Sequence, residues 1–216
     1  MEPFTVLTGV AAPLLLDDVN TDQIAPVLGR HQLHEDYAKL FFARWRQRAD
    51  GQEEPSFVLN RPQFRQARIL VAGRNFGCGS SRESAVWAAV GAGIRCIVAR
   101  SFADIFRENC LKNGLLPIVL SPDDSEVLEA RVQQADGQAD FTVDLVAQRI
   151  VCPDGTAIAF TLAPAERTAL LEGLDEIGLT LKSLDAIAQW ESRTRREQPW
   201  LQEARQYSGA RRGRTN

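Results

Sequence analysis

The sequence predicts an α/β fold whose core consists of parallel strands joined by helices. Two short apolar runs, residues 69–72 and 96–99, are typical of buried strands, and a third run spans 115–120. Helical segments, 82–91 and 102–112, lie between these runs. Alternation of strand and helix favours a parallel sheet with right-handed crossover connections. We therefore expect residues 69–120 to form a β-α-β-α-β unit.

The residues before this unit predict two more strands and a helix. Strands are expected at 6–9 and 12–16, followed by a polar turn at 17–22. The segment 35–48 predicts one helix, because four large apolar or aromatic side chains recur there at helical spacing: Tyr37, Leu40, Phe41 and Trp45.

The residues after the unit predict a mixture of further strands and helices. Helices are expected at 126–134, 164–174 and 183–191, and strands at 141–145, 149–152 and 157–162. The fold class is therefore α/β, with a parallel β-α-β core, additional strands and C-terminal helices.

Composition and charge indicate a single globular domain with a basic tail. The chain has 216 residues, of which 44% are hydrophobic and 25% charged, as is usual for globular proteins. Of the net charge of −3, residues 193–216 contribute +5 through seven Arg and two Glu, so residues 1–192 carry −8. We predict a domain over 1–192 and a tail over 193–216.

An acidic body argues against nucleic acid as a partner. The tail is expected to be a solvated terminus, with contact to RNA or a membrane as the alternative.

Cysteine and histidine usage bears on compartment and on metals. The four cysteines form no C-x-x-C pair, and no basic segment precedes an apolar stretch at the start of the sequence. We expect reduced thiols, a cytoplasmic location and no membrane span, since no apolar run approaches about 20 residues. With only His31 and His34 besides the cysteines, the chain offers no usual zinc or iron–sulfur ligand spacing.

The glycine-rich segment 77–83, GCGSSRE, follows the strand at 69–72 and is the strongest local signal. Ser80 and Glu83 fit a capping box, which predicts that Ser80 is the N-cap of the next helix. In the functional interpretation, small residues at 77, 79 and 80 let backbone N–H groups approach an anion at a helix N-terminus, and Arg82 adds a fork for a carboxylate or phosphate. In the structural interpretation, Ser80 only caps the helix.

Three other interpretations of local motifs fail or are weak. The segment 77–82 begins like a G-x-G-x-x-G dinucleotide loop, but Arg82 stands in place of the third glycine. Residues 18–22 begin like a calcium loop, but Gln23 replaces the turn glycine. Cys78 has no His or second Cys nearby in the sequence to activate a thiolate, so a thiol mechanism is not favoured.

Beside GCGSSRE, five segments in order resemble one family, the small subunit of 3-isopropylmalate dehydratase, equivalent to the swivel domain of aconitases. The resemblance covers roughly residues 4–191. These segments are NTDQIAP (20–26), FVLN (57–60), SFADIF (101–106), NGLLP (113–117) and GLDEIGLTL (173–181). The resemblance implies a single swivel-type domain.

The resemblance also implies a two-chain hydro-lyase. Its large subunit holds a [4Fe–4S] cluster whose open iron binds the substrate hydroxyl and carboxylate, and the small subunit holds no metal and closes over the site. Matched by position, Ser80 is the base that removes the carbon-bound proton, Arg82 clamps a substrate carboxylate, and Asp22 lines the closed site. Four further residues are expected to contact the substrate: Gly79, Ser81, Thr21 and Arg30.

The implied reaction dehydrates 2-isopropylmalate to an enzyme-bound alkene and rehydrates it to 3-isopropylmalate, a step of leucine biosynthesis. The sequence differs from the usual family pattern at Ser84-Ala85-Val86, where His-Ala-Pro is common, and in the segment 27–34, which in this family helps choose the substrate side group. A hydro-lyase for a smaller branched diacid, such as citraconate or dimethylmalate, is therefore an alternative. A non-catalytic module that binds an anion at 77–82 is another.

Overall fold

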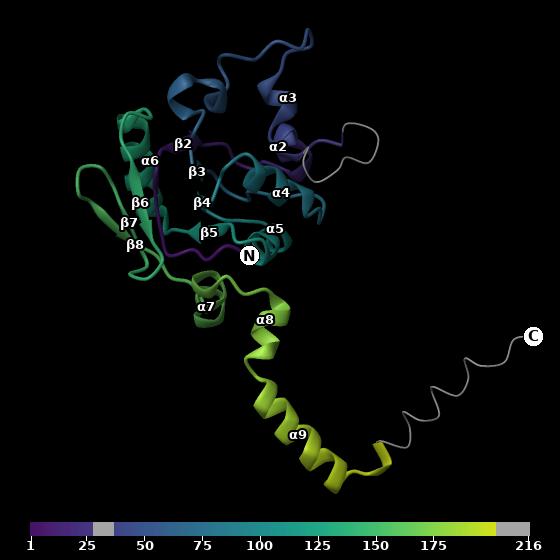
Figure 1. The fold of residues 1–216 in the computed structure, drawn as a ribbon. Helices are drawn as coiled ribbons and strands as arrows, with labels where there is room; N and C mark the ends of the chain where they lie inside the picture. Colours follow the sequence, from purple (N-terminus) through teal and green to yellow (C-terminus); the bar gives the residue numbers. More distant parts are fainter. Residues whose placement is uncertain (28–36, 202–216) are drawn as a thin grey trace, which may run out of the picture. The chain divides into compact units, whose positions relative to one another are not determined.

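The structure is a computed structural model that describes residues 1–27 and 37–201 (Figure 1). The chain divides into two compact units, Met1–Asp175 and Glu176–Asn216. The first unit contains both sheets. Within the described ranges, no helix is long and apolar enough to cross a membrane.

The first sheet is the predicted parallel core. It has four parallel strands in sequence order: β2 (Ala11–Leu14), β3 (Ile69–Ala72), β4 (Cys96–Ala99) and β5 (Leu116–Val119). Helix α4 (Ser84–Gly91) connects β3 to β4, and α5 (Asp104–Lys112) connects β4 to β5. The predicted β-α-β-α-β unit is confirmed, and β3 and β4 have the predicted bounds.

The second sheet is antiparallel and consists of the additional strands. Its order is β1 (Val6–Gly9), β6 (Phe141–Asp144), β7 (Arg149–Val151) and β8 (Ala157–Ala159). The first strand of the chain therefore pairs with a strand more than 130 residues later, with Val6 opposite Asp144.

The parallel sheet is buried on both faces. Alternate residues of β3 belong to different apolar clusters: Leu70 and Ala72 pack with helices α4 and α5, whereas Ile69 and Val71 pack with the antiparallel sheet. Burial on both faces explains why these strands are continuous apolar runs instead of alternating ones.

Nine further helices and 3-10 turns complete the described chain. They are α1 (Thr21–Ile24), α2 (Tyr37–Leu40), α3 (Ala43–Arg46), the 3-10 turns η2 (Val58–Asn60) and η3 (Pro62–Phe64), α6 (Pro122–Ala135), α7 (Pro164–Glu172), α8 (Glu176–Leu181) and α9 (Leu184–Glu197).

The single helix predicted over 35–48 is wrong within the described residues. Phe42 has φ 54° and ψ 32°, a left-handed conformation that ends α2 and precedes α3. Its ring is completely buried and stacks on Trp45, with centroids 5.3 Å apart. We infer that packing of the aromatic rings offsets the cost of the left-handed backbone, which periodicity alone does not reveal.

Helix α9 extends past the expected end at 191, so three arginines of the predicted tail are helical. Arg193 and Arg195 form i,i+4 ion pairs with Glu197 and Glu191, at 4.0 and 3.7 Å. The other four arginines of the tail lie outside the described residues. The division of the chain at 192 stays a prediction.

Candidate active site

Two loops meet at the carboxyl end of the parallel sheet, one after β2 and one after β3. The Asp17 carboxylate, after β2, accepts hydrogen bonds from the backbone N–H of Arg74 (2.6 Å) and from its guanidinium Nε and Nη2 (3.0 and 2.8 Å). These hydrogen bonds lower the pKa of Asp17. A side chain at Gly73 would place Cβ 2.5 Å from the carbonyl oxygen of Leu16, so glycine permits this close approach.

The loop after β3 then runs alongside residues 19–21. The backbone N–H of Gly77 donates to the carbonyl of Val19 (2.7 Å), and that of Thr21 donates to the carbonyl of Cys78 (2.9 Å). Gly77 has φ +79°, and a Cβ there would lie 2.1 Å from Cγ of Phe106. Glycine at this position is therefore required by both backbone conformation and packing.

Four of the predicted site residues lie together where these loops meet. The Ser80 hydroxyl lies 3.0 Å from the Thr21 hydroxyl. Arg82 Nε donates a hydrogen bond to the Ser80 hydroxyl at 2.8 Å. Arg82 Nη2 also donates to Asp22 Oδ1 in a close ion pair. Ser80 is exposed, and the side chains of Asp22 and Arg82 are 65% and 28% exposed. The exposed Ser80 oxygen thus has one charged donor, Arg82, and one neighbouring hydroxyl, Thr21, as its partners.

The predicted capping box at Ser80 and Glu83 is wrong. Helix α4 begins at Ser84, its N-cap is Glu83, and no side chain caps it. The Ser80 hydroxyl instead has Thr21 and Arg82 as partners, while Glu83 accepts a hydrogen bond from the Asn113 side chain (2.7 Å). These contacts between distant segments leave residues 80–82 outside the helix.

The anion interpretation needs a related correction. Helix α4 begins four residues after Ser80, so Ser80 does not lie at the first turn of the helix. The N–H of Gly77 is used by Val19, so this N–H is not a donor to a bound anion. The partners of the Ser80 oxygen are side chains: Arg82 Nε donates to it, and the Thr21 hydroxyl, whose hydrogen is directed to the Ser80 carbonyl, lies 3.0 Å away.

The other predicted substrate contacts divide into three cases. Gly79, with φ +95°, and exposed Ser81 belong to the same loop as Ser80. Thr21 is only 1% exposed and lies beneath this loop. Arg30 lies outside the described residues. All of these substrate contacts stay predictions.

Sequence reasoning missed the device that positions Thr21. Asn20 and Gln23 form a capping box on α1: the Asn20 side chain accepts from the Gln23 N–H (2.9 Å), and the Gln23 side chain accepts from the Asn20 N–H (2.7 Å). The spacing N-x-x-Q was the available signal, because it matches the capping pattern.

The four cysteines form no disulfide bond. Cys78 is half-buried, and its thiol donates to the carbonyl of Asp18 (3.4 Å). Cys96 and Cys110 are fully buried, which raises the pKa of both thiols. Over residues 1–27 and 37–201, no group of three or more His, Cys, Asp or Glu side chains is placed to hold a metal ion. The described residues therefore do not fit an iron–sulfur cluster.

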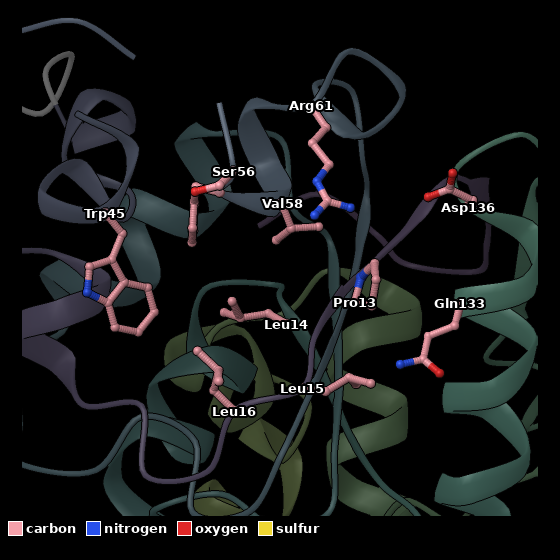
Figure 2. A pocket seen from close by; sticks show the side chains of 11 residues that line it. Pro13, Leu14, Leu15, Leu16, Trp45, Ser56, Val58, Arg61, Gln133 and Asp136 are labelled. Carbon is pink, nitrogen blue, oxygen red and sulfur yellow. The ribbon is translucent and has the colours of Figure 1, made fainter. Parts of the chain in front are cut away.

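A cavity of about 560 Å³ lies beside β2, the edge strand of the parallel sheet. Figure 2 shows its apolar wall, with Trp45 and Val58, and Arg61 above it. Pro13, which also lines it, lacks an N–H and suits an edge strand. Ser80, Asp22 and Arg82 are not among the residues that line this cavity, so the predicted chemistry does not belong to it.

Comparisons with known proteins agree with the resemblance found in the sequence. A family model of the aconitase C-terminal domain matches residues 1–123. A model described as LeuD_N matches residues 126–164, and one of the C-terminal domain of the 3-isopropylmalate dehydratase small subunit matches 176–204.

Individual relatives with the same name align with this chain over almost their whole length. The 3-isopropylmalate dehydratase small subunit of Azorhizobium caulinodans is 48% identical over 93% of this chain and 100% of its own. That of Rhodospirillum centenum is 51% identical over 93% of this chain and 98% of its own. The crystal structure of a 3-isopropylmalate dehydratase from Methanocaldococcus jannaschii matches with a TM-score of 0.60 and 28% identity, over 86% of this chain and 99% of that one. The chain therefore belongs to the 3-isopropylmalate dehydratase small-subunit family, and its fold is the aconitase swivel-type fold.

Proposed function

We propose that this chain is the small subunit of a hydro-lyase that interconverts 2-isopropylmalate and 3-isopropylmalate in leucine biosynthesis and is active only with a large subunit. The observation that carries the proposal is the exposed Ser80 hydroxyl, which accepts a hydrogen bond from the guanidinium of Arg82 at 2.8 Å. The named relatives support the choice of reaction.

Ser80 is proposed as the base that removes the proton from the substrate carbon. A neutral hydroxyl is far too weak for this task, so the alkoxide must be stabilised by several pKa units, each equivalent to about 1.4 kcal/mol. A preorganised donor of the oxyanion-hole type contributes about 3–4 kcal/mol. Arg82 supplies such a donor with a full positive charge. During dehydration the Ser80 alkoxide takes the carbon-bound proton, the electron pair of the C–H bond forms the double bond, and the hydroxyl on the neighbouring carbon leaves as hydroxide. Rehydration adds hydroxide to the other carbon of the double bond and returns the proton from Ser80 to carbon.

Arg82 is also proposed to bind a substrate carboxylate. Its guanidinium has five N–H donors in a fixed plane, of which Nε is directed to Ser80 and one on Nη2 to Asp22. The remaining donors suit a carboxylate, which guanidinium binds in bidentate fashion. Asp22, the more exposed partner, keeps the guanidinium in this orientation. Binding of the substrate and stabilisation of the Ser80 alkoxide therefore both depend on the side chain of Arg82.

The cofactor and the partner follow from the family and are part of the proposal. We assign the [4Fe–4S] cluster to the large subunit, because the described residues of this chain do not fit it. The small hydroxy-diacid would bind between the two chains, with no nucleic acid or membrane involved. The four unpaired cysteines support a reducing, cytoplasmic location.

The test is anaerobic co-expression with the large subunit and assay of the purified complex on 2-isopropylmalate, citraconate and dimethylmalate, each followed by ultraviolet absorbance of the alkene. We expect turnover of 2-isopropylmalate that requires both chains. Preference for a smaller diacid would keep the mechanism and change the pathway, as the family departures at Ser84 and 27–34 would explain. Lack of activity on all three would favour the anion-binding module.

A further inference from the structure

We infer that Thr21 is a positioning residue for the reaction: its buried hydroxyl is a second hydrogen-bond donor to the Ser80 oxygen when that oxygen is deprotonated. The inference rests on the proposed function of Ser80 as the base. It gives Thr21 a role beneath the serine, in place of direct contact with substrate.

The position of the Thr21 hydroxyl carries this inference. Thr21 Oγ1 lies 3.0 Å from Ser80 Oγ and 3.1 Å from the Ser80 carbonyl oxygen, and the residue is 1% exposed. A hydroxyl has a single hydrogen. While Ser80 is neutral, Thr21 donates to the carbonyl and accepts from the Ser80 hydroxyl. Once Ser80 is an alkoxide, rotation of the same O–H directs its hydrogen to Ser80 Oγ.

Arg82 and Thr21 approach the Ser80 oxygen from different segments of the chain. Arg82 Nε donates at 2.8 Å from two residues further along the same loop. Thr21 belongs to α1, which is 59 residues away in sequence. Together they supply one charged and one neutral donor to the same oxygen, and a buried, preorganised donor stabilises developing charge more than water does.

The backbone around Thr21 is fixed before any substrate arrives. The capping box of Asn20 and Gln23 caps the N-terminus of α1. The Thr21 N–H donates to the carbonyl of Cys78, and the Thr21 carbonyl accepts from the N–H of Ala25 (3.0 Å). Only the hydroxyl hydrogen has to move when Ser80 loses its proton. This is the arrangement expected for a donor that needs little reorganisation during the reaction.

The first test uses the complete two-subunit enzyme. Thr21→Val keeps the shape of the side chain and removes the hydroxyl. We expect kcat to fall by about 10- to 100-fold with KM changed less than about threefold, because the group is buried and does not touch substrate. The pH at which kcat rises is expected to be about one unit higher in this variant, since Ser80 becomes harder to deprotonate. Thr21→Ser is expected to restore both values.

The second test does not depend on turnover. Ser80→Cys places a thiol at the same site, and its pKa follows from the rate of alkylation by iodoacetamide at different pH values, with fragment mass spectra separating positions 78 and 80. We expect this pKa to be about one unit higher when Thr21→Val is added, and unchanged when Thr21→Ser is added. Thr21→Ala removes the same hydroxyl without inserting a methyl group and is expected to match Thr21→Val. The pKa of Cys78 serves as the internal reference.

The two tests separate the inference from the proposed function. An active complex in which Thr21→Val and Thr21→Ala leave kcat, its pH profile and the thiol pKa unchanged would overturn the inference and leave the function standing. A thiol pKa that responds to Thr21→Val in a chain that supports no turnover of the three diacids would support the contact and overturn the function. Loss of activity in Thr21→Ser equal to that in Thr21→Val would indicate a structural role and overturn the inference.

Discussion

Two serines, Ser80 and Ser121, follow strands of the same parallel sheet, and both begin a pattern with an acidic residue at the fourth position. Ser121 comes two residues after β5 and is the N-cap of α6, accepting from the Asp124 N–H at 3.1 Å and donating to its carboxylate at 2.7 Å. Ser80 comes eight residues after β3 and caps nothing.

The difference lies in where each hydroxyl finds its partners. Those of Ser121 are three residues away, and Pro122 at the first helical position favours the start of the helix there. Those of Ser80 are Arg82 and the distant Thr21. A serine satisfied by the local backbone serves stability, whereas one that contacts side chains from two segments and is open to solvent is available for chemistry.

The largest effect that would separate the two serines is on turnover. Ser80→Ala is expected to lower kcat of the two-subunit enzyme by about 10³-fold, because the substrate proton loses its acceptor. Anaerobic measurement of alkene absorbance gives kcat, and gel filtration checks that the subunits still assemble. A Ser80→Ala complex with near-normal turnover would remove the functional difference between Ser80 and Ser121.

The conformation of the loop that carries Ser80 depends on close packing at Gly77, and Gly77→Ala tests this dependence. We expect a loss of about 2–4 kcal/mol in the free energy of unfolding, from the positive φ and from overlap of the new Cβ with Phe106. Chemical denaturation measures it. Gly155→Ala is the matched control: it has φ +86° but no atom within 4 Å of the new Cβ, so only the backbone cost of about 1 kcal/mol is expected. Equal losses at both positions would contradict the packing argument.

Arg82→Lys tests whether the side chain next to Ser80 also binds the substrate. A lysine keeps the charge but not the planar fork, so the apparent affinity for substrate is expected to weaken by about 10- to 100-fold. Steady-state kinetics of the complex measures KM. Arg131→Lys, on α6 and paired with Asp154, is expected to leave KM unchanged. An unaltered KM in Arg82→Lys would exclude the carboxylate clamp.

The smallest effect is expected at the serine that caps a helix. Ser121→Ala should cost about 1 kcal/mol in the free energy of unfolding, since the first turn of α6 loses its capping acceptor. Turnover of the folded complex should not change. Thermal denaturation beside the activity assay checks both, and a marked fall in kcat would mean that α6 takes part in the site.

Much of the fold was predictable because its signals are local. The strands β3 and β4 are runs of four apolar residues that are buried on both faces, and the predicted bounds agree with the structure. The break at Phe42 was not predictable, because it depends on aromatic neighbours such as Phe57, 15 residues away in sequence (centroids 5.6 Å apart).

The candidate site was predictable in its residues but not in its contacts. Family resemblance pointed to Ser80, Arg82 and Asp22, and the structure brings them together. Local pattern assigned Ser80 to a cap, because S-x-x-E is the same string in a helix start and in this loop. The hydrogen bond that distinguishes the two, to Thr21, spans 59 residues and depends on the tertiary fold.

The pairing of β2 with β3 has a consequence for the chemistry. Ala11 lies opposite Ile69 and Leu14 opposite Ala72, and the loops that carry Thr21 and Ser80 leave the ends of these two strands. A slip of one residue between the strands would displace one loop by about 3.3 Å, more than any hydrogen bond tolerates. Sheet register therefore sets the distance between Thr21 and Ser80, the proposed base. An insertion or deletion inside β2 or β3 is expected to act as an active-site mutation, even though neither strand contributes a side chain to the proposed site.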